Sequence, residues 1–158
     1  PLIIGGMIRR PVNFVMYHRI YKIPLLNFIF RTGKAIPIAS RDEHPEILEA
    51  AYRRIHGVLE AGDVLGIFPE GKITSDGEIQ PFRPGIDKII AERPVPVLPI
   101  ALCNLWGSMF SRRDPVLKRR PYKLWSTIEL KIGKPIPPEE VTSIRLQKEV
   151  ELLRGDQR

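Results

Sequence analysis

The sequence predicts an α/β fold, with a mostly parallel central sheet flanked by helices in a single domain that covers residues 1–158. Three observations predict this class. The chain has 158 residues, 43% of them hydrophobic, which is enough for one core and too few for two. Short apolar runs alternate with stretches of helical periodicity. No tight turn joins the apolar runs at 64–68 and 95–102, which indicates a crossover connection between parallel strands.

The first half of the chain predicts two strands and one helix. Residues 13–17 form a strand candidate, and residues 35–39 form a second one that Pro37 restricts to an edge, because proline has no N–H for the ladder. Residues 45–61 carry apolar side chains at helical spacing. Pro45 suits the first turn of this helix, and Gly62 suits the position just after its end.

The second half predicts three strands and two helices. The runs 64–68 and 95–102 are continuously apolar, as in strands covered on both faces, and Ile86, Ile89 and Ile90 indicate a short helix between them. Residues 126–132 alternate apolar and polar side chains, which is typical of a strand near an edge with one face in water. A last helix is expected over about 138–153.

Composition excludes several classes of protein. Cys103 is the only cysteine, so neither an internal disulfide nor a cysteine-based zinc site is expected. The longest apolar stretch, residues 24–30, is far shorter than the roughly 20 residues of a membrane-spanning helix. Lys and Arg number 25 against 18 Asp and Glu, a net charge of +7, which favours anionic partners. The residues from Pro1 onward do not show the pattern of a secretory leader, and we expect the chain to be part of a longer protein.

The segment 69–77, directly after the 64–68 strand, contains a carboxylate, an ammonium group, hydroxyls and glycines. Gly66, Gly71 and Lys72 match the start of a phosphate-binding loop, G-x-x-x-x-G-K. The next residue should be Ser or Thr but is Ile73, and Glu70 would repel a phosphate inside such a loop. A nucleotide site is therefore not expected.

The same string, Phe68-Pro69-Glu70-Gly71 followed by a basic residue and hydroxyls, resembles the third motif of the glycerolipid acyltransferase family, of the lysophosphatidate acyltransferase type. The Pro99-Ile100 pair resembles the fourth motif, and residues 33–41 resemble the second. The resemblance covers roughly residues 13–106. It implies transfer of a fatty acyl group from acyl-CoA or acyl carrier protein to the hydroxyl of a lysophospholipid such as 1-acylglycerol-3-phosphate, with no metal and no further cofactor.

The first motif of that family, a His and an Asp separated by four residues, supplies the general base. None of the three histidines here, His18, His44 and His56, starts this motif at the family's position. His44 is more simply explained as a helix cap or a surface residue. We therefore expect no catalytic residue in this chain, the His and Asp ahead of Pro1, and an inactive fragment.

What the resemblance implies for this chain is the acceptor-binding half of the site. Arg41 and Lys72 would bind the acceptor phosphate, and Pro99 would contact the acyl donor. The full set of expected acceptor-binding residues is Arg41, Phe68, Pro69, Glu70, Gly71, Lys72 and Thr74. Each has a structural alternative: the segment could simply end a strand and turn the chain, Glu70 could pair with Lys72 or Arg83, and Pro99 could shape a strand end.

Two segments bear on membranes. Residues 17–31 mix apolar and basic side chains, which suits either an interfacial element or part of the core. Residues 106–123 form a basic segment whose expected membrane contacts are Trp106, Phe110, Arg112 and Arg113. These features predict a place on the cytoplasmic face of an anionic membrane, either as a peripheral protein or as the cytosolic domain of a membrane protein fused upstream. The sequence leaves these two alternatives open, and no nucleic-acid partner is expected. The alternative is a non-catalytic basic module that binds anionic lipid or nucleic acid.

Overall fold

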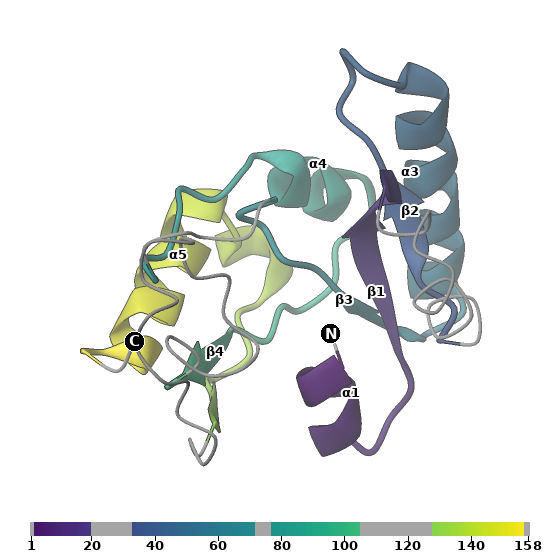
Figure 1. Ribbon diagram of the computed structural model, residues 1–158. Coiled ribbons are helices and arrows are strands. Elements are labelled where there is room, and N and C mark those ends of the chain that lie inside the picture. Colours follow the sequence, from purple (N-terminus) through teal and green to yellow (C-terminus); the bar gives the residue numbers. More distant parts are fainter. Residues whose placement is uncertain (1, 20–32, 72–76, 105–127, 157–158) are drawn as a thin grey trace, which may run out of the picture. The chain divides into compact units, whose positions relative to one another are not determined.

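The computed structural model describes residues 2–19, 33–71, 77–104 and 128–156, which form two compact units (Figure 1). The first unit comprises residues 1–68 and 91–93, and the second comprises residues 69–90 and 94–158. Helices pack on a parallel three-stranded sheet in the first unit, so the predicted α/β class is confirmed. No helix among the described residues is long and apolar enough to cross a membrane.

The sheet of the first unit has the strand order β2–β1–β3. Its strands are β1 (Val12–Tyr17), β2 (Ile36–Ile38) and β3 (Val64–Gly66), and both pairs are parallel. The central strand, β1, is buried over its middle four residues. β2 carries Pro37 and lies at one edge of this sheet, as its missing N–H predicts.

Helix α3 (Pro45–Glu60) covers this sheet through contacts with β2 and β3. Pro45 occupies its first turn, where the missing N–H costs no hydrogen bond. Ala51 and Ile55, one turn apart, are its buried residues. Gly62 follows the helix in the left-handed region, with φ +74°. The helix predicted at 45–61 is thus confirmed to within one residue.

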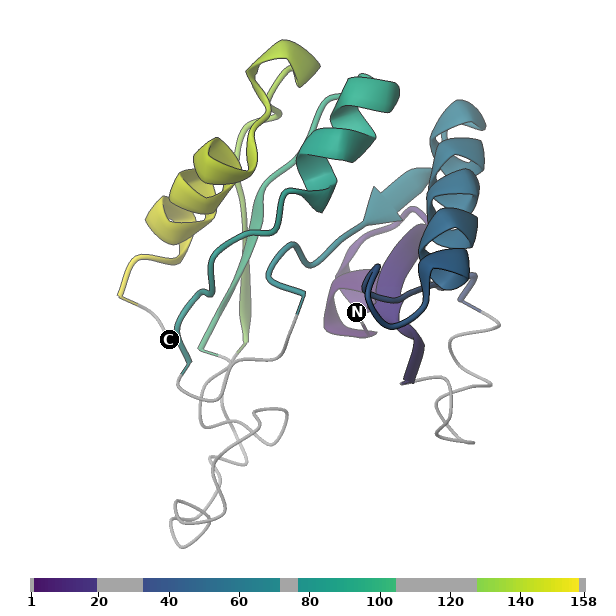
Figure 2. The same cartoon turned by 90° about the horizontal axis from the view of Figure 1, so that it is seen from above.

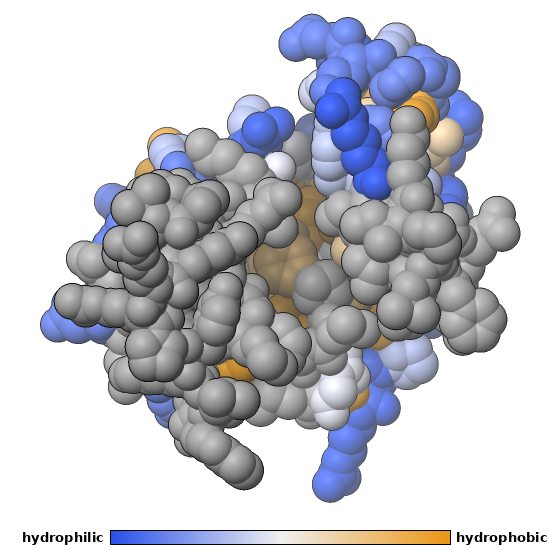
Figure 3. Space-filling model, in the orientation of Figure 1, coloured by the Kyte–Doolittle hydropathy of each residue, from blue (hydrophilic) through white to orange (hydrophobic). Residues whose placement is uncertain are grey.

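The first unit also contains a short helix that the sequence analysis missed, α1 (Leu2–Met7). Two glycines in six residues give it weak helical propensity, so packing must hold it. Its Ile4 is buried, and Phe14 of β1 lies against Gly5. Figures 1 and 2 show α1 and α3 on either side of β1. In Figure 3 the part of the surface formed by α3 is mainly hydrophilic, as expected for the outer face of an amphipathic helix.

The second unit contains helix α4 (Gly85–Glu92), whose last residues belong to the first unit, and the antiparallel pair β4 (Ile100–Cys103) and β5 (Glu129–Ile132). The isoleucines predicted to face inward from α4 are buried, namely Ile86, Ile89 and Ile90. Cys103, at the end of β4, has no exposed surface and is a free thiol.

Three predictions about the strands are wrong in detail. Of the run at 95–102, only residues 100–102 lie in a strand, β4, because the prolines at 96 and 99 cannot donate to a ladder, and Leu98 is 45% exposed. β3 is only partly buried, since it lies at the edge of its described sheet. Ile132, expected on the buried face of its strand, is 52% exposed.

Helix α5 (Ser143–Arg154) packs on β4 and β5. It begins later than the predicted residue 138, because the Thr142 side chain caps it by accepting the backbone N–H of Arg145 at 3.1 Å. The residues before it form a separate 3₁₀ turn, η3 (Pro138–Glu140). Leu146 is the buried residue of α5, whereas Leu152 is 76% exposed.

Candidate functional site

The segment that carries the candidate site follows β3, which ends at Gly66, and its first residue is Phe68, the last residue of this stretch of the first unit. The Phe68 ring stacks on Phe14, with centroids 6.1 Å apart and 20° between the ring planes. A Cβ at Gly66 would lie 2.6 Å from the Phe14 ring and 2.8 Å from Val12. Gly66 therefore gives Phe14 room to pack, which accounts for this glycine of the incomplete phosphate-loop pattern.

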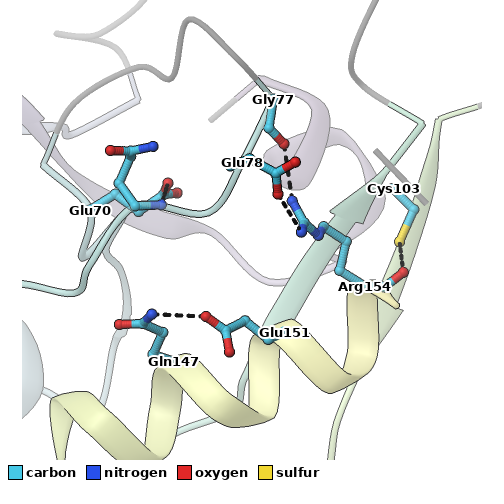
Figure 4. Close-up of polar contacts among 8 residues, drawn as sticks. Glu70, Gly77, Glu78, Cys103, Gln147, Glu151 and Arg154 are labelled. Carbon is cyan, nitrogen blue, oxygen red and sulfur yellow. Dashed lines mark hydrogen bonds and ion pairs between the residues drawn. The ribbon is translucent and has the colours of Figure 1, made fainter. Parts of the chain in front are cut away.

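Glu70 and Gly71 follow in the second unit, in a loop that is closed by hydrogen bonds to the segment 80–83. The Glu70 carboxylate accepts the backbone N–H of Gln80 through Oε2 at 2.8 Å. The carbonyl of Pro69 accepts the backbone N–H of Arg83 at 2.9 Å. Glu70 is shown in Figure 4. One carboxylate oxygen of Glu70 thus fixes the loop itself, and the predicted contact of Glu70 with the acceptor stays a prediction.

Gly71 is required at its position for two reasons. Its φ is +66°, a conformation that residues with a side chain rarely adopt. In addition, a Cβ there would lie 2.7 Å from Nε and 2.9 Å from Cδ of Arg83. The side chain of Arg83 therefore lies directly against the Gly71 backbone.

Arg83 was not among the predicted site residues. Its place two residues before Gly85 suits a cap or a phosphate contact, but in the sequence a surface ion pair explains it at least as well. The structure removes that alternative for the part of the chain it describes: Arg83 is exposed, and no described carboxylate lies within salt-bridge distance of it. An arginine without such a partner, beside a glycine turn, can bind an anion.

Pro99 is buried, and its carbonyl accepts the backbone N–H of Gly133 at 2.9 Å. A Cβ at Gly133 would lie 2.9 Å from Pro99 and 3.1 Å from Leu153. These contacts support the structural role of Pro99 at the start of β4. Its contact with an acyl donor stays a prediction.

Arg41 is exposed in the loop before α3, in the first unit. Burial raises the pKa of Tyr52, and the nearby Glu92 adds to this, while Arg41 partly opposes it. The phosphate site predicted for Arg41 and Lys72 stays a prediction, because Lys72 lies outside the described residues. The remaining predicted contacts lie outside the described residues: Lys72, Thr74, Trp106, Phe110, Arg112 and Arg113.

Each histidine has local partners. His44 is exposed at the residue before α3, and its Nδ1 lies 3.0 Å from Oε1 of Glu46. The His18 ring meets the His44 ring edge-on at 5.1 Å. His56 Nε2 lies 2.7 Å from Oε2 of Glu92. Within the described ranges, no three His, Cys, Asp or Glu side chains gather as metal ligands would.

Comparison with known proteins decides the family. The sequence model of the acyltransferase family, described simply as "Acyltransferase", matches residues 1–103. The chain belongs to this family. The resemblance inferred from the Phe68–Gly71 string is thereby confirmed.

The acyltransferase domain is similar to two plant proteins and to one solved structure. A chloroplastic 1-acyl-sn-glycerol-3-phosphate acyltransferase of Brassica napus is 28% identical over 105 residues, 66% of this chain and 30% of that protein. An N-acylphosphatidylethanolamine synthase of Arabidopsis thaliana is 38% identical over 84 residues, 51% of this chain and 28% of that protein. The crystal structure of the Thermotoga maritima 1-acyl-sn-glycerophosphate acyltransferase PlsC superposes with a TM-score of 0.60 at 22% identity, and the match covers 91% of this chain and 54% of that structure.

This chain covers only part of the length of each of these proteins. The chain spans less than a third of the length of each of the two plant relatives it matches, and about half of the solved acyltransferase. The structural likeness shows that the fold is shared. The acceptor substrate and the acyl donor of this chain are therefore proposed below.

Proposed function

We propose that this acyltransferase domain binds the acceptor in the transfer of a fatty acyl group, from acyl-CoA or acyl carrier protein, to the hydroxyl of a lysophospholipid such as 1-acylglycerol-3-phosphate. The observation that carries the proposal is the loop at 69–71, where Arg83, without a described carboxylate partner, lies against Gly71. An exposed guanidinium beside an exposed glycine suits a phosphate monoester, which it can contact with two N–H groups.

The reaction requires the acceptor oxygen to attack the thioester carbonyl while its proton passes to a base, with the thiol leaving. In our proposal that base is a His, oriented by an Asp, which precedes Pro1 in the natural protein. This chain contributes the other part: Arg83 and Lys72 hold the phosphate, and Glu70 keeps the loop closed through Gln80. Fixing the phosphate fixes the hydroxyl on the same glycerol, which lowers the entropic cost of the attack.

The test uses the full natural protein with acyl-CoA and acyl carrier protein as donors and lysophosphatidate as acceptor. Glu70→Ala removes the carboxylate that closes the loop and should lower kcat/KM by roughly ten- to a hundredfold, the range for a hydrogen bond to a charged group. Glu70→Gln keeps an acceptor oxygen and should lose less. Lys72→Ala should also lower kcat/KM, with the fold intact by circular dichroism. Unchanged turnover in both alanine variants would refute the proposal.

The similarity to an N-acylphosphatidylethanolamine synthase supports a second acceptor class, a phospholipid amine. Phosphatidylethanolamine should therefore be offered beside lysophosphatidate in the same assay. Vesicle and oligonucleotide binding, measured with and without salt, test the alternative of a non-catalytic basic module. Such a module would bind vesicles or oligonucleotides equally well in the Glu70→Ala variant, whereas acyl transfer should depend on Glu70.

A further inference from the structure

The C-terminal helix α5 contacts the segment that follows the Glu70 loop (Figure 4). The Arg154 guanidinium donates from one terminal nitrogen to the carbonyl of Gly77 and from the other to Oε2 of Glu78, both at 3.0 Å. The Arg154 side chain is only 16% exposed. A fork of this kind fixes two acceptors at once and is stronger than a surface ion pair.

Arg154 is itself held in place by the second unit. Its backbone carbonyl accepts the thiol of Cys103 at 3.9 Å, which ties the end of α5 to the end of β4. Its Nε is buried and has no hydrogen-bond partner among the described residues. Burying a polar atom in this way carries a cost, so the two contacts with residues 77 and 78 must outweigh it.

A second contact lies two turns earlier on α5. Oε1 of Gln147 accepts the backbone N–H of Phe82 at 3.1 Å, and Nε2 of Gln147 donates to Oε1 of Glu151 at 2.8 Å. This pair of bonds fixes the orientation of the Gln147 amide. Gln147, Glu151 and Arg154 are spaced four and three residues apart, so they lie on one face of the helix, as Figure 4 shows.

The chain of contacts continues to the candidate site. Between the two points held by α5 lies Gln80, whose N–H is donated to Glu70. Next to Phe82 lies Arg83, whose N–H is donated to Pro69 and whose side chain lies against Gly71. The helix therefore fixes both sides of the short segment that closes the loop. It does so from residues beyond 103, where the family match ends.

We propose that Arg154 and Gln147 are positioning residues, which hold residues 77–83 so that Glu70 and Arg83 keep the geometry of acceptor binding. The kinetic part of this inference rests on the proposed function. The structural part does not, because it concerns only the protection of three backbone amides, those of Gln80, Phe82 and Arg83.

The experiment measures amide hydrogen exchange in the full natural protein. Arg154→Ala should raise exchange at residues 80, 82 and 83 by roughly tenfold, as expected for loss of a charge-assisted contact. Arg154→Lys can bond one of the two acceptors and should retain part of the protection. Gln147→Ala removes the acceptor of the Phe82 N–H and should raise exchange at that amide. Gln147→Glu keeps an acceptor oxygen and should retain the protection.

The matched control is Arg145→Ala on the same helix, which removes an equal charge and an exposed ion pair with Glu140. It should leave the three amides unchanged. Protection equal to wild type in both Arg154→Ala and Gln147→Ala would overturn the inference. If Arg154→Ala does not fold, Arg154→Lys and Gln147→Ala still decide it.

Kinetics separate positioning from general stability. Arg154→Ala should raise KM for lysophosphatidate by roughly tenfold while kcat and KM for the donor change less than about twofold. Equal losses in all three parameters would contradict a positioning role. If the wild-type protein transfers no acyl group, the proposed function is wrong. The hydrogen-exchange measurements still test whether Arg154 and Gln147 hold residues 77–83.

Discussion

The Arg83 side chain lies so close to the backbone of Gly71 that a single added carbon on the glycine would come within 2.7 Å of the guanidinium nitrogen Nε. This contact joins the Phe68–Gly71 string to a residue outside it. The roles of Gly71 and Arg83 can be tested separately, because either residue can be substituted while the other is left unchanged.

Gly71→Ala should damage the site more than the fold. The change forces an alanine to φ +66° and pushes the Arg83 side chain aside. The backbone strain should cost about 1–2 kcal/mol in the free energy of unfolding, while KM for the acceptor rises as Arg83 moves. Thermal unfolding and acceptor kinetics measure the two effects. Gly62→Ala is the control, since Gly62 has φ +74° but open space around it. An equal rise in KM in both variants would show that strain alone is responsible.

Removal of the Arg83 charge should weaken binding of phosphorylated acceptors selectively. Arg83→Ala should raise KM for lysophosphatidate by roughly ten- to a hundredfold. Arg83→Lys keeps the positive charge but lacks the paired N–H donors of the guanidinium, and should raise KM by less. KM for an uncharged monoacylglycerol should stay the same. The control is Arg53→Ala, on the exposed side of α3. If the charged and uncharged acceptors are affected alike, Arg83 does not bind the phosphate.

The pKa of Glu43 should depend on the Tyr17 hydroxyl. Tyr17 donates to both carboxylate oxygens of Glu43, at 3.0 and 2.8 Å, and this hydrogen bond is the main cause that lowers the pKa of Glu43 below its ordinary value of 4.5, with Arg19 adding to it. A lowered carboxyl pKa stabilises the fold above the ordinary value, and that stability is lost as the pH falls through the lowered value.

Tyr17→Phe should therefore raise the pKa of Glu43 toward 4.5, as measured by NMR titration of the carboxyl carbon. The difference in stability between wild type and Tyr17→Phe should shrink below that pH. Arg19→Ala should have a smaller effect, because Arg19 is a lesser cause. A Glu43 pKa that is unchanged in Tyr17→Phe would contradict the assignment.

Two glycine substitutions in the first unit should have opposite effects on stability. Gly66→Ala would place a methyl group 2.6 Å from the Phe14 ring and should lower the free energy of unfolding by about 1–3 kcal/mol. Gly57→Ala, within α3 and with nothing within 4 Å of the added carbon, should raise it by about 0.5–1 kcal/mol. Chemical denaturation measures both. A stable Gly66→Ala protein would show that the Phe14 ring can move away.

Sequence reasoning predicted the parts of the fold that local signals determine. Pro45 and Gly62 marked the ends of α3, and the isoleucines of α4 marked its buried face. It failed where apolar character competed with the loss of backbone donors, as in the run 95–102, and where a cap set the helix start, as Thr142 does. Apolar runs report burial, but they do not report which N–H groups are present.

The site was predictable only in part, for a similar reason. The Phe68–Gly71 string identified the loop through its resemblance to a family. Arg83 and Arg154 act through contacts with residues 12 and 77 positions away, and no local pattern reports such contacts. Arginines of this kind look like ordinary surface charges in the sequence.

The pairing of β4 with β5 and α5 also bears on where the gene can be divided. A polypeptide that stops at residue 103, the end of the family match, would leave β4 as a bare edge and Cys103 open to oxidation. Such a product should aggregate on expression. Workers who choose boundaries by family match alone would then mistake a failure of solubility for a lack of activity.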